Sequence, residues 1–418
     1  MDFYGCNCKN VTITEGIFGD VWINQIFSSP MSTIIKSYTM TNTNRMEVVV
    51  ITWGATIVSL KCPDKYGHSA DVVLGFDDMK GYTNPVTNPF IGCILGRCAN
   101  RIKDGHITIR GKDYQLTKND FNGKHHLHGG TNGFGRKVWD SYIGGCSVVM
   151  SYLSQDGEEG YPGSVLTMIK FKLTPDNKFE ICMRATTSKP TIVNLSHGSM
   201  FNLAGHDAGE SELKKHKVLL NCDRWTFADY IDPVPTGAIR GVGGTVMDFR
   251  IPRKLGEYME KIPPGEGYDH NFCITKSGPG GSLFAAKVWH MKSGRNNISY
   301  VLNIGLYSNL YIFLYFQDME EDEEGELYKS DNENEREETK GEKFYKKLST
   351  TMPKKIEFLL GKHGARYKKY SAFSIQPQNY PNAIHYVNFI YFFVNFSFSF
   401  IEKFRYRSNR AAKCTMNC

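Results

Sequence analysis

The chain has 418 residues, enough for one large β domain or two smaller ones. Aromatic residues make up 13% of the sequence and it holds 40 glycines, which favours strands and turns over long helices. The net charge of +7 comes from basic residues that are spread along the sequence. A nucleic-acid-binding surface would need them clustered, with aromatic residues between them, so we expect an ordinary solvated surface.

The N-terminus, MDFYGCNCKN, lacks a basic stretch followed by an apolar run, which predicts a cytoplasmic protein. The 11 cysteines show no CxxC pair and no zinc-like spacing. They therefore indicate free thiols in a reducing compartment and no metal site. The apolar run 300–316 is too short and too rich in polar residues for a membrane span, so no membrane contact is expected.

Short alternating segments separated by turn residues fill the first half of the chain. Two hairpins are predicted, one about Arg110-Gly111-Lys112-Asp113 and one about Pro175-Asp176-Asn177. No helical stripe of useful length appears before residue 250. Many short strands at this spacing predict an all-β fold of the β-sandwich type. The expected strands cover residues 48–53, 57–60, 106–109, 114–116, 165–173 and 179–183.

Two segments do not fit this strand pattern. Residues 296–345 open with an apolar run and continue into an acidic tract, 318–342, that holds thirteen Asp and Glu residues. We expect this segment to be an insert whose acidic half is disordered, because it has too little apolar surface to offset the entropy of ordering. Residues 390–418 form an atypical C-terminal tail. The predicted domain therefore covers residues 10–389, interrupted by 296–345.

An ordered series of motifs points to one enzyme family. It includes Gly96-Arg97-Cys98-Ala99-Asn100-Arg101-Ile102, Leu127-His128-Gly129-Gly130 and Gly267-Tyr268-Asp269-His270-Asn271-Phe272. In this order the motifs resemble those of the aldose 1-epimerases, also called galactose mutarotases. The resemblance spans roughly residues 10–295 and 348–389. It implies a large antiparallel β-sandwich of the galactose mutarotase-like type, which agrees with the strand pattern.

The resemblance also implies an activity. Enzymes of this family interconvert the α and β anomers of free hexoses such as galactose and glucose. A base removes the proton of the C1 hydroxyl while an acid protonates the ring oxygen, so the ring opens and recloses. The implied partner is a small-molecule aldohexose, no cofactor is needed, and we expect a monomer.

By the same resemblance four residues contact the sugar: Asn100, Arg101, His128 and Asp269. A guanidinium, an imidazole and a carboxylate form charge-assisted hydrogen bonds with hydroxyl groups. Each residue alone has a simpler interpretation, such as a structural ion pair for Arg101 or a turn for Asp269. Four matches in family order, each inside its own motif, favour sugar binding.

The two proton-transfer positions of the family are substituted. Where the family reads N-L-x-N-H-x-Y-F-N-L, this chain has Gly198 at the acid histidine and a histidine, His197, one place earlier. Where the family reads L-E-x-Q-x-Y-P, the base glutamate is Gln376. An amide does not accept a proton near neutral pH. In a regular strand successive side chains point to opposite faces, so His197 would face away from the pocket unless a bulge at Gly198 redirects it.

Two functions follow from these residues. In the first, the protein is an active mutarotase with catalytic residues His197, Gln376 and His128. Glu357 is then a possible substitute base, and His125 and His126 are possible acids, although a solvent-facing glutamate and exposed loop histidines are simpler accounts. In the second, it is a catalytically impaired sugar-binding paralogue. A third possibility is a relative that acts on phosphorylated sugars, which the cation excess favours, but no phosphate-binding glycine-rich loop is present.

Overall fold

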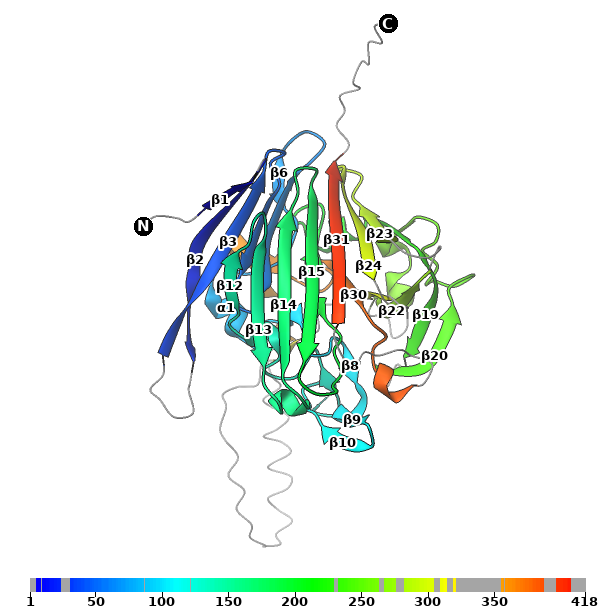
Figure 1. Ribbon diagram of the computed structural model, residues 1–418. Helices are drawn as coiled ribbons and strands as arrows, with labels where there is room; N and C mark the ends of the chain where they lie inside the picture. Colours follow the sequence, from blue (N-terminus) through cyan, green and yellow to red (C-terminus); the bar gives the residue numbers. More distant parts are fainter. Residues whose placement is uncertain are drawn as a thin grey trace, which may run out of the picture.

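The fold is a large β-sandwich in which extended antiparallel sheets pack face to face, and the helices of the described residues are short and lie at the margins (Figure 1). The computed structural model describes residues 5–8, 10–23, 31–85, 87–120, 122–228, 232–262, 267–275, 282–303, 309–313, 319–320, 355–356, 358–386 and 396–406. The all-β sandwich predicted from the strand pattern is confirmed.

Three sheets contain most of the strands. The first runs in chain order through β1 (Gly5–Cys8), β2 (Val11–Ile23), β3 (Met31–Asn42), β4 (Glu47–Ile51), β5 (Thr56–Pro63) and β6 (Ser69–Asp71). The nine-stranded sheet has the order β12 (Asp140–Ile143), β13 (Val148–Ser154), β14 (Val165–Leu173), β15 (Lys178–Thr187), β31 (Phe396–Tyr406), β24 (Arg295–Asn303), β23 (Ser282–Trp289), β18 (Lys217–Leu220) and β21 (Arg253–Lys254). The third sheet has the order β17 (Met200–Phe201), β30 (Phe373–Gln378), β25 (Asn309–Phe313), β22 (Asp269–Ile274), β19 (Cys222–Ala228) and β20 (Pro235–Gly241).

Small strand pairs and short helices complete the described residues. The helices are α1 (Met79–Thr83) and α2 (Gly209–Leu213), with seven 3-10 turns besides. The pairs are β8 (Arg101–Ile102) with β11 (His126–Leu127), β9 (His106–Ile109) with β10 (Lys112–Gln115), β7 (Ile94–Leu95) with β16 (Ser196–His197), β26 (Met319–Glu320) with β27 (Lys355–Ile356), and β28 (Leu359–Leu360) with β29 (Arg366–Tyr367).

The core forms because alternate residues of each strand point inward. Along β14 the odd-numbered positions from Val165 to Leu173 are buried, and its hairpin partner β15 buries Phe179, Ile181 and Met183. These side chains meet Phe272 and other residues of the third sheet in one continuous cluster. Each large apolar side chain buried in this way contributes about 1.5–3 kcal/mol. Both hairpins predicted from the sequence are confirmed.

Parts of residues 296–345, the segment expected to interrupt the domain, form strands of the sandwich where the structure describes them. Residues 295–303 form β24, which pairs with β23 and β31, and residues 309–313 form β25, which pairs with β22 and β30. The strand was hidden because its inward face is largely polar. Asn297 and Ser299 are fully buried, and the Ser299 hydroxyl donates to Asn297 Oδ1. The rest of 296–345, apart from β26, lies outside the described residues, as does the disorder predicted there.

The C-terminal segment 390–418 also contributes a strand to the nine-stranded sheet. Strand β31 lies between β15 and β24, in the middle of the nine-stranded sheet (red in Figure 1). Its backbone register pairs Phe398 with Met183 on one side and with Asn303 on the other. Because such pairing is non-local, sequence near residue 400 does not reveal it.

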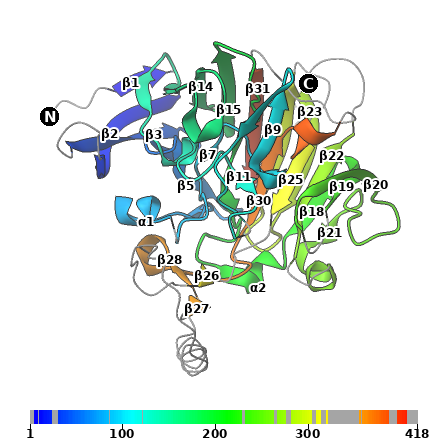
Figure 2. The same cartoon turned by 90° about the horizontal axis from the view of Figure 1, so that it is seen from below.

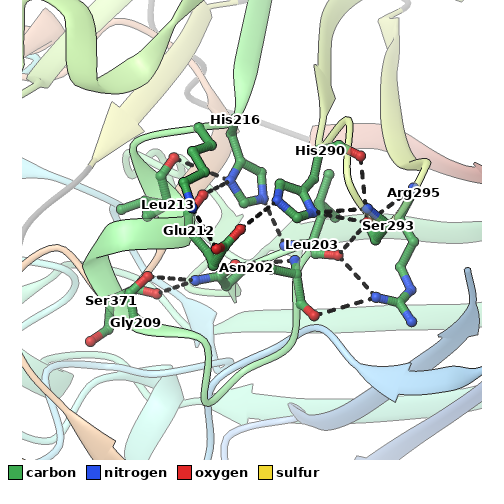
Figure 3. A network of polar contacts seen from close by, with 12 residues as sticks. Asn202, Leu203, Gly209, Glu212, Leu213, His216, His290, Ser293, Arg295 and Ser371 are labelled. Atoms are coloured by element: carbon green, nitrogen blue, oxygen red, sulfur yellow. Dashed lines mark hydrogen bonds and ion pairs between the residues drawn. The ribbon is translucent and has the colours of Figure 1, made fainter.

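A polar network fastens the chain that follows β17 (Figure 3). The Leu203 N–H donates to His216 Nε2 at 2.9 Å, and Arg295 donates to the Leu203 carbonyl at 3.2 Å. The rings of His216 and His290 stack with centroids 4.9 Å apart, and His290 Nε2 lies 2.9 Å from the Glu212 carboxylate. These contacts tie α2, β18 and the turn before β24 together, which holds β17 at the edge of the third sheet.

Within the described ranges, no helix has the length and apolar character needed to cross a membrane. Cys62, Cys93, Cys98, Cys222 and Cys273 carry free thiols, and burial raises the pKa of the first three to about 12. The prediction of free thiols is wrong for Cys146, which is disulfide-bonded. Pairing depends on distance in space, which cysteine spacing along the chain does not give.

Candidate functional site

Asn100 and His128 are held together by their backbones. Strand β8 pairs with β11, and the residues on either side of this short ladder continue the contact. The His128 N–H donates to the Asn100 carbonyl at 3.2 Å, and the Asn100 N–H donates to His128 Nδ1 at 3.1 Å. Both residues have positive φ angles, 66° and 51°, so their side chains leave the ladder at the turn. The structure thus brings together two residues that the sequence placed 28 positions apart.

The contact to Nδ1 fixes the tautomer of His128. Because Nδ1 accepts a hydrogen bond, the ring proton lies on Nε2. Burial, followed by the nearby charge of Arg101, lowers the pKa of His128 to about 3. The ring is therefore neutral at pH 7, and it can donate a hydrogen bond but holds no readily released proton.

Arg101 joins the remaining predicted contact residue, Asp269, to the same place. Its Nε donates to the Asp120 carboxylate at 2.6 Å, and its guanidinium lies 3.7 Å from the Asp269 carboxylate. The Asp269 side chain is 35% exposed, compared with 17% for Arg101. Asp120 was missed in the sequence because it lies in no motif, and only the fold reveals that it orients Arg101.

Gln376 lies on β30 and is 5% exposed. Its Nε2 donates to Ser374 Oγ at 3.3 Å, and the Ser374 hydroxyl donates to the Ser199 carbonyl at 2.8 Å. Its Oε1 is buried without a hydrogen-bond partner among the described residues. Gln376 thus presents a fixed amide whose oxygen is able to accept a hydrogen bond from a bound group.

His197 lies close to this chain of contacts. The Ser199 N–H donates to His197 Nδ1 at 3.4 Å, so His197, Ser199, Ser374 and Gln376 are linked in series. His197 is fully buried, and burial lowers its pKa to about 3. Like His128, it is neutral at pH 7. A catalytic role for His197, Gln376 or His128 stays a prediction.

Gly198 occupies a position that excludes a side chain. Its N–H donates to the Cys93 carbonyl at 2.8 Å, and its own carbonyl accepts from the Gly92 N–H at 2.8 Å. A Cβ at residue 198 would lie 2.1 Å from the Phe90 carbonyl oxygen. The turn 90–93 therefore packs against the space that a histidine at this position needs.

The simpler account expected the alternative acids, His125 and His126, to be exposed loop histidines, and this is wrong. His125 and His126 are both fully buried. His125 accepts from the Asp104 N–H and lies 2.8 Å from the Asp232 carboxylate. His126 contacts the Thr117 carbonyl and the Tyr161 hydroxyl with its two ring nitrogens. Both have structural partners in the loops behind His128, and Glu357 lies outside the described residues.

Two charged residues that sequence reasoning did not single out hold these loops in place. Arg97 is 2% exposed and donates to the carbonyls of Pro162, Gly163 and Gln155 and to the Ser154 hydroxyl. The Glu159 carboxylate accepts from the backbone N–H groups of Thr131 and Asn132. Since Arg97 lies inside the motif Gly96-Arg97-Cys98-Ala99-Asn100-Arg101-Ile102, its position was visible in the sequence but its role was not.

Acid should destabilise this fold because buried histidines stay neutral. Burial lowers the pKa to about 4 for His126 and to about 3 for His128 and His197, whereas unfolded histidines titrate near 6.5. The unfolded chain therefore binds protons first, and stability is fully present above pH 6.5 and is lost as the pH falls toward 4–3. By pH 5 the loss is about 2 kcal/mol for each histidine. Urea unfolding at pH 7 and pH 5 measures it, and equal free energies of unfolding would contradict it.

Comparisons with known proteins agree on one family. The family model described as aldose 1-epimerase matches residues 36–394. The galactose mutarotase of Bos taurus is 33% identical over 379 residues, covering 91% of this chain and 93% of that protein. The aldose 1-epimerase of Escherichia coli K12 is 31% identical over 255 residues, 60% of this chain and 71% of that protein. The crystal structure of an aldose epimerase homologue from C. elegans aligns with a TM-score of 0.69 at 26% identity, covering 87% of this chain and 97% of that chain.

Proposed function

The chain belongs to the aldose 1-epimerase family, and from that premise we propose that it binds a free aldohexose, such as galactose or glucose, but interconverts the anomers only slowly. We propose further that it does so in the cytoplasm, as a monomer and without a cofactor. Galactose is proposed as the ligand because relatives of this chain are named galactose mutarotases.

Sugar binding is supported by the grouping of Asn100, Arg101, His128 and Asp269. They come from three separate segments of the chain and are joined by direct contacts. Together they offer a neutral N–H donor, a guanidinium and a carboxylate, which suit the donors and acceptors of a polyhydroxylated ring. Arg101 is already balanced by Asp120 and Asp269, so the site suits a neutral ligand better than a phosphorylated one.

The main observation in favour of a slow rate is the amide of Gln376 at the base position. The family base is a carboxylate, and an amide at this position holds a hydroxyl group without removing its proton. Gly198 supplies no acid, and the two nearby histidines, His128 and His197, are neutral at pH 7. Loss of a single acid or base contribution costs about 10²–10⁴-fold in rate.

One observation favours the second candidate, an active mutarotase. His197 is linked through Ser199 and Ser374 to Gln376, so a histidine does lie in the neighbourhood of the base position. In that case His197→Ala removes an acceleration that the wild-type protein produces.

Polarimetry of fresh α-D-galactose, together with thermal melting in its presence, tests the proposal. We expect the wild-type protein to be stabilised by galactose while optical rotation decays at close to the spontaneous rate. The Arg101→Met variant should lose the galactose-induced stabilisation, since it removes the guanidinium between Asp120 and Asp269. Rapid decay that His197→Ala abolishes would support the active enzyme instead, and absence of any stabilisation would contradict sugar binding.

A further inference from the structure

Polar side chains continue past the candidate site along one face of the third sheet. Asp269 and Asn271 alternate on β22 with His270 and Phe272, and Phe272 packs in the core. Gln376 and Gln378 alternate on β30 with Ile375, which also packs in the core. Since alternate residues of a strand share a face, these four side chains lie on the face opposite the core. Strands β22, β25 and β30 lie side by side in Figure 2.

The strand register shows how these residues are arranged. Asn271 pairs with Tyr311 of β25, and Tyr311 pairs with Gln376, so Asn271 and Gln376 are level with each other. Asn309 of β25 pairs with Gln378. Along the sheet, Gln378 therefore lies two residues beyond the level of Asn271, on the side away from Asp269. One such step of two residues is about 7 Å along the strand.

Among the described residues, Asn271 and Gln378 have no hydrogen-bond partners that would explain their burial. Each is 2% exposed, and both side-chain amide atoms of each are buried without a partner among the described residues. Leaving a buried amide donor or acceptor unpaired costs about 1–3 kcal/mol. Folded proteins pair the large majority of buried polar side-chain atoms. Unpaired amides on two strands of the same sheet face, beside the candidate site, are therefore what a bound polar group would satisfy.

We propose that Asn271 and Gln378 form a second hydroxyl-binding subsite, next to Gln376, for a neutral polyhydroxylated ligand. The inference rests on the proposed sugar-binding function and deepens it. Each amide offers two donors and an acceptor and carries no charge, which matches hydroxyl groups, each both donor and acceptor. Neither residue contributes a positive charge, so the subsite selects against phosphorylated sugars.

Apolar variants of similar shape show whether Asn271 and Gln378 bind a ligand or only stabilise the fold. In Asn271→Leu and Gln378→Met the amide is lost and the side-chain volume is kept. Because the amides have no partner among the residues that the structure describes, these variants should melt at or above the wild-type temperature. Their affinity for D-galactose, measured by titration calorimetry, should fall about tenfold or more, as expected for one or two lost hydrogen bonds.

The matched control is Thr167→Val. Thr167 Oγ1 is likewise buried without a partner among the described residues, but it lies on β14 in the nine-stranded sheet. This variant should keep wild-type affinity for galactose. Lowered melting temperatures with unchanged affinity in Asn271→Leu and Gln378→Met would overturn the subsite alone, because they indicate bound water in a structural role. Failure of the wild-type protein to bind galactose would overturn the proposed function as well, and tighter binding of galactose 6-phosphate would overturn the neutral selectivity.

Discussion

A chain that ends at residue 389 should fail to fold. This truncation removes β31, whose backbone pairs with β15 on one side and with β24 on the other. Its loss would leave two unpaired strand edges in the middle of the nine-stranded sheet and open the core beside Ile181 and Val301, both fully buried. Single domains are stable by only about 5–15 kcal/mol, and the loss of a central strand should exceed this.

Circular dichroism melting of the purified chains measures this effect. The matched control is a chain that ends at Tyr406, which keeps the whole of β31 and should melt as cooperatively as the full-length protein. If the chain ending at residue 389 melts cooperatively at the full-length temperature, β31 does not hold the sheet together.

The Gln376→Glu variant should accelerate anomer interconversion by about 10²-fold or more over the wild type. The new carboxylate would occupy the position of the present amide, beside Ser374, and would accept the proton that the amide leaves in place. The base acts only when deprotonated, so the rate should rise with pH through the pKa of the carboxyl group and then level off. Polarimetry from pH 4 to pH 8 measures this profile.

Gln376→Met is the control for the shape of the side chain. It has neither an acceptor oxygen nor a titratable group, so it should show no acceleration over the spontaneous rate at any pH. A Gln376→Glu variant that binds galactose but shows no acceleration would indicate either that residue 376 does not face the reacting hydroxyl or that the missing acid at Gly198 limits the rate. Restoring a histidine at Gly198 is a poorer test, because its Cβ would meet the Phe90 carbonyl.

Local patterns predicted the sandwich, since strands such as β14 show strict alternation and the hairpin turns carry Pro, Asp, Asn and Gly. They failed where the pattern was not local. Strand β24 buries Asn297 and Ser299, which resemble loop residues in sequence, and β31 pairs with strands far away in the chain. Strands with buried polar residues, such as β24, and strands with distant partners, such as β31, could therefore not be predicted from local sequence.

The candidate site shows a similar limit. The motifs gave Asn100, Arg101, His128 and Asp269, and the structure brings all four together. Asp120 orients Arg101 from outside any motif, and the packing of Phe90 against Gly198 depends on two turns meeting in space. Burial, which makes His128 and His197 neutral, is likewise a property of the folded protein and not of the sequence.

The most direct test of the account is exchange spectroscopy by NMR on galactose labelled at C1, with the purified protein present. The method reports binding of each anomer and their interconversion in one sample. We expect the anomer signals to show binding, while exchange between α and β stays at the spontaneous rate in the wild-type protein and rises in Gln376→Glu. Fast exchange between the anomers with the wild-type protein would contradict it.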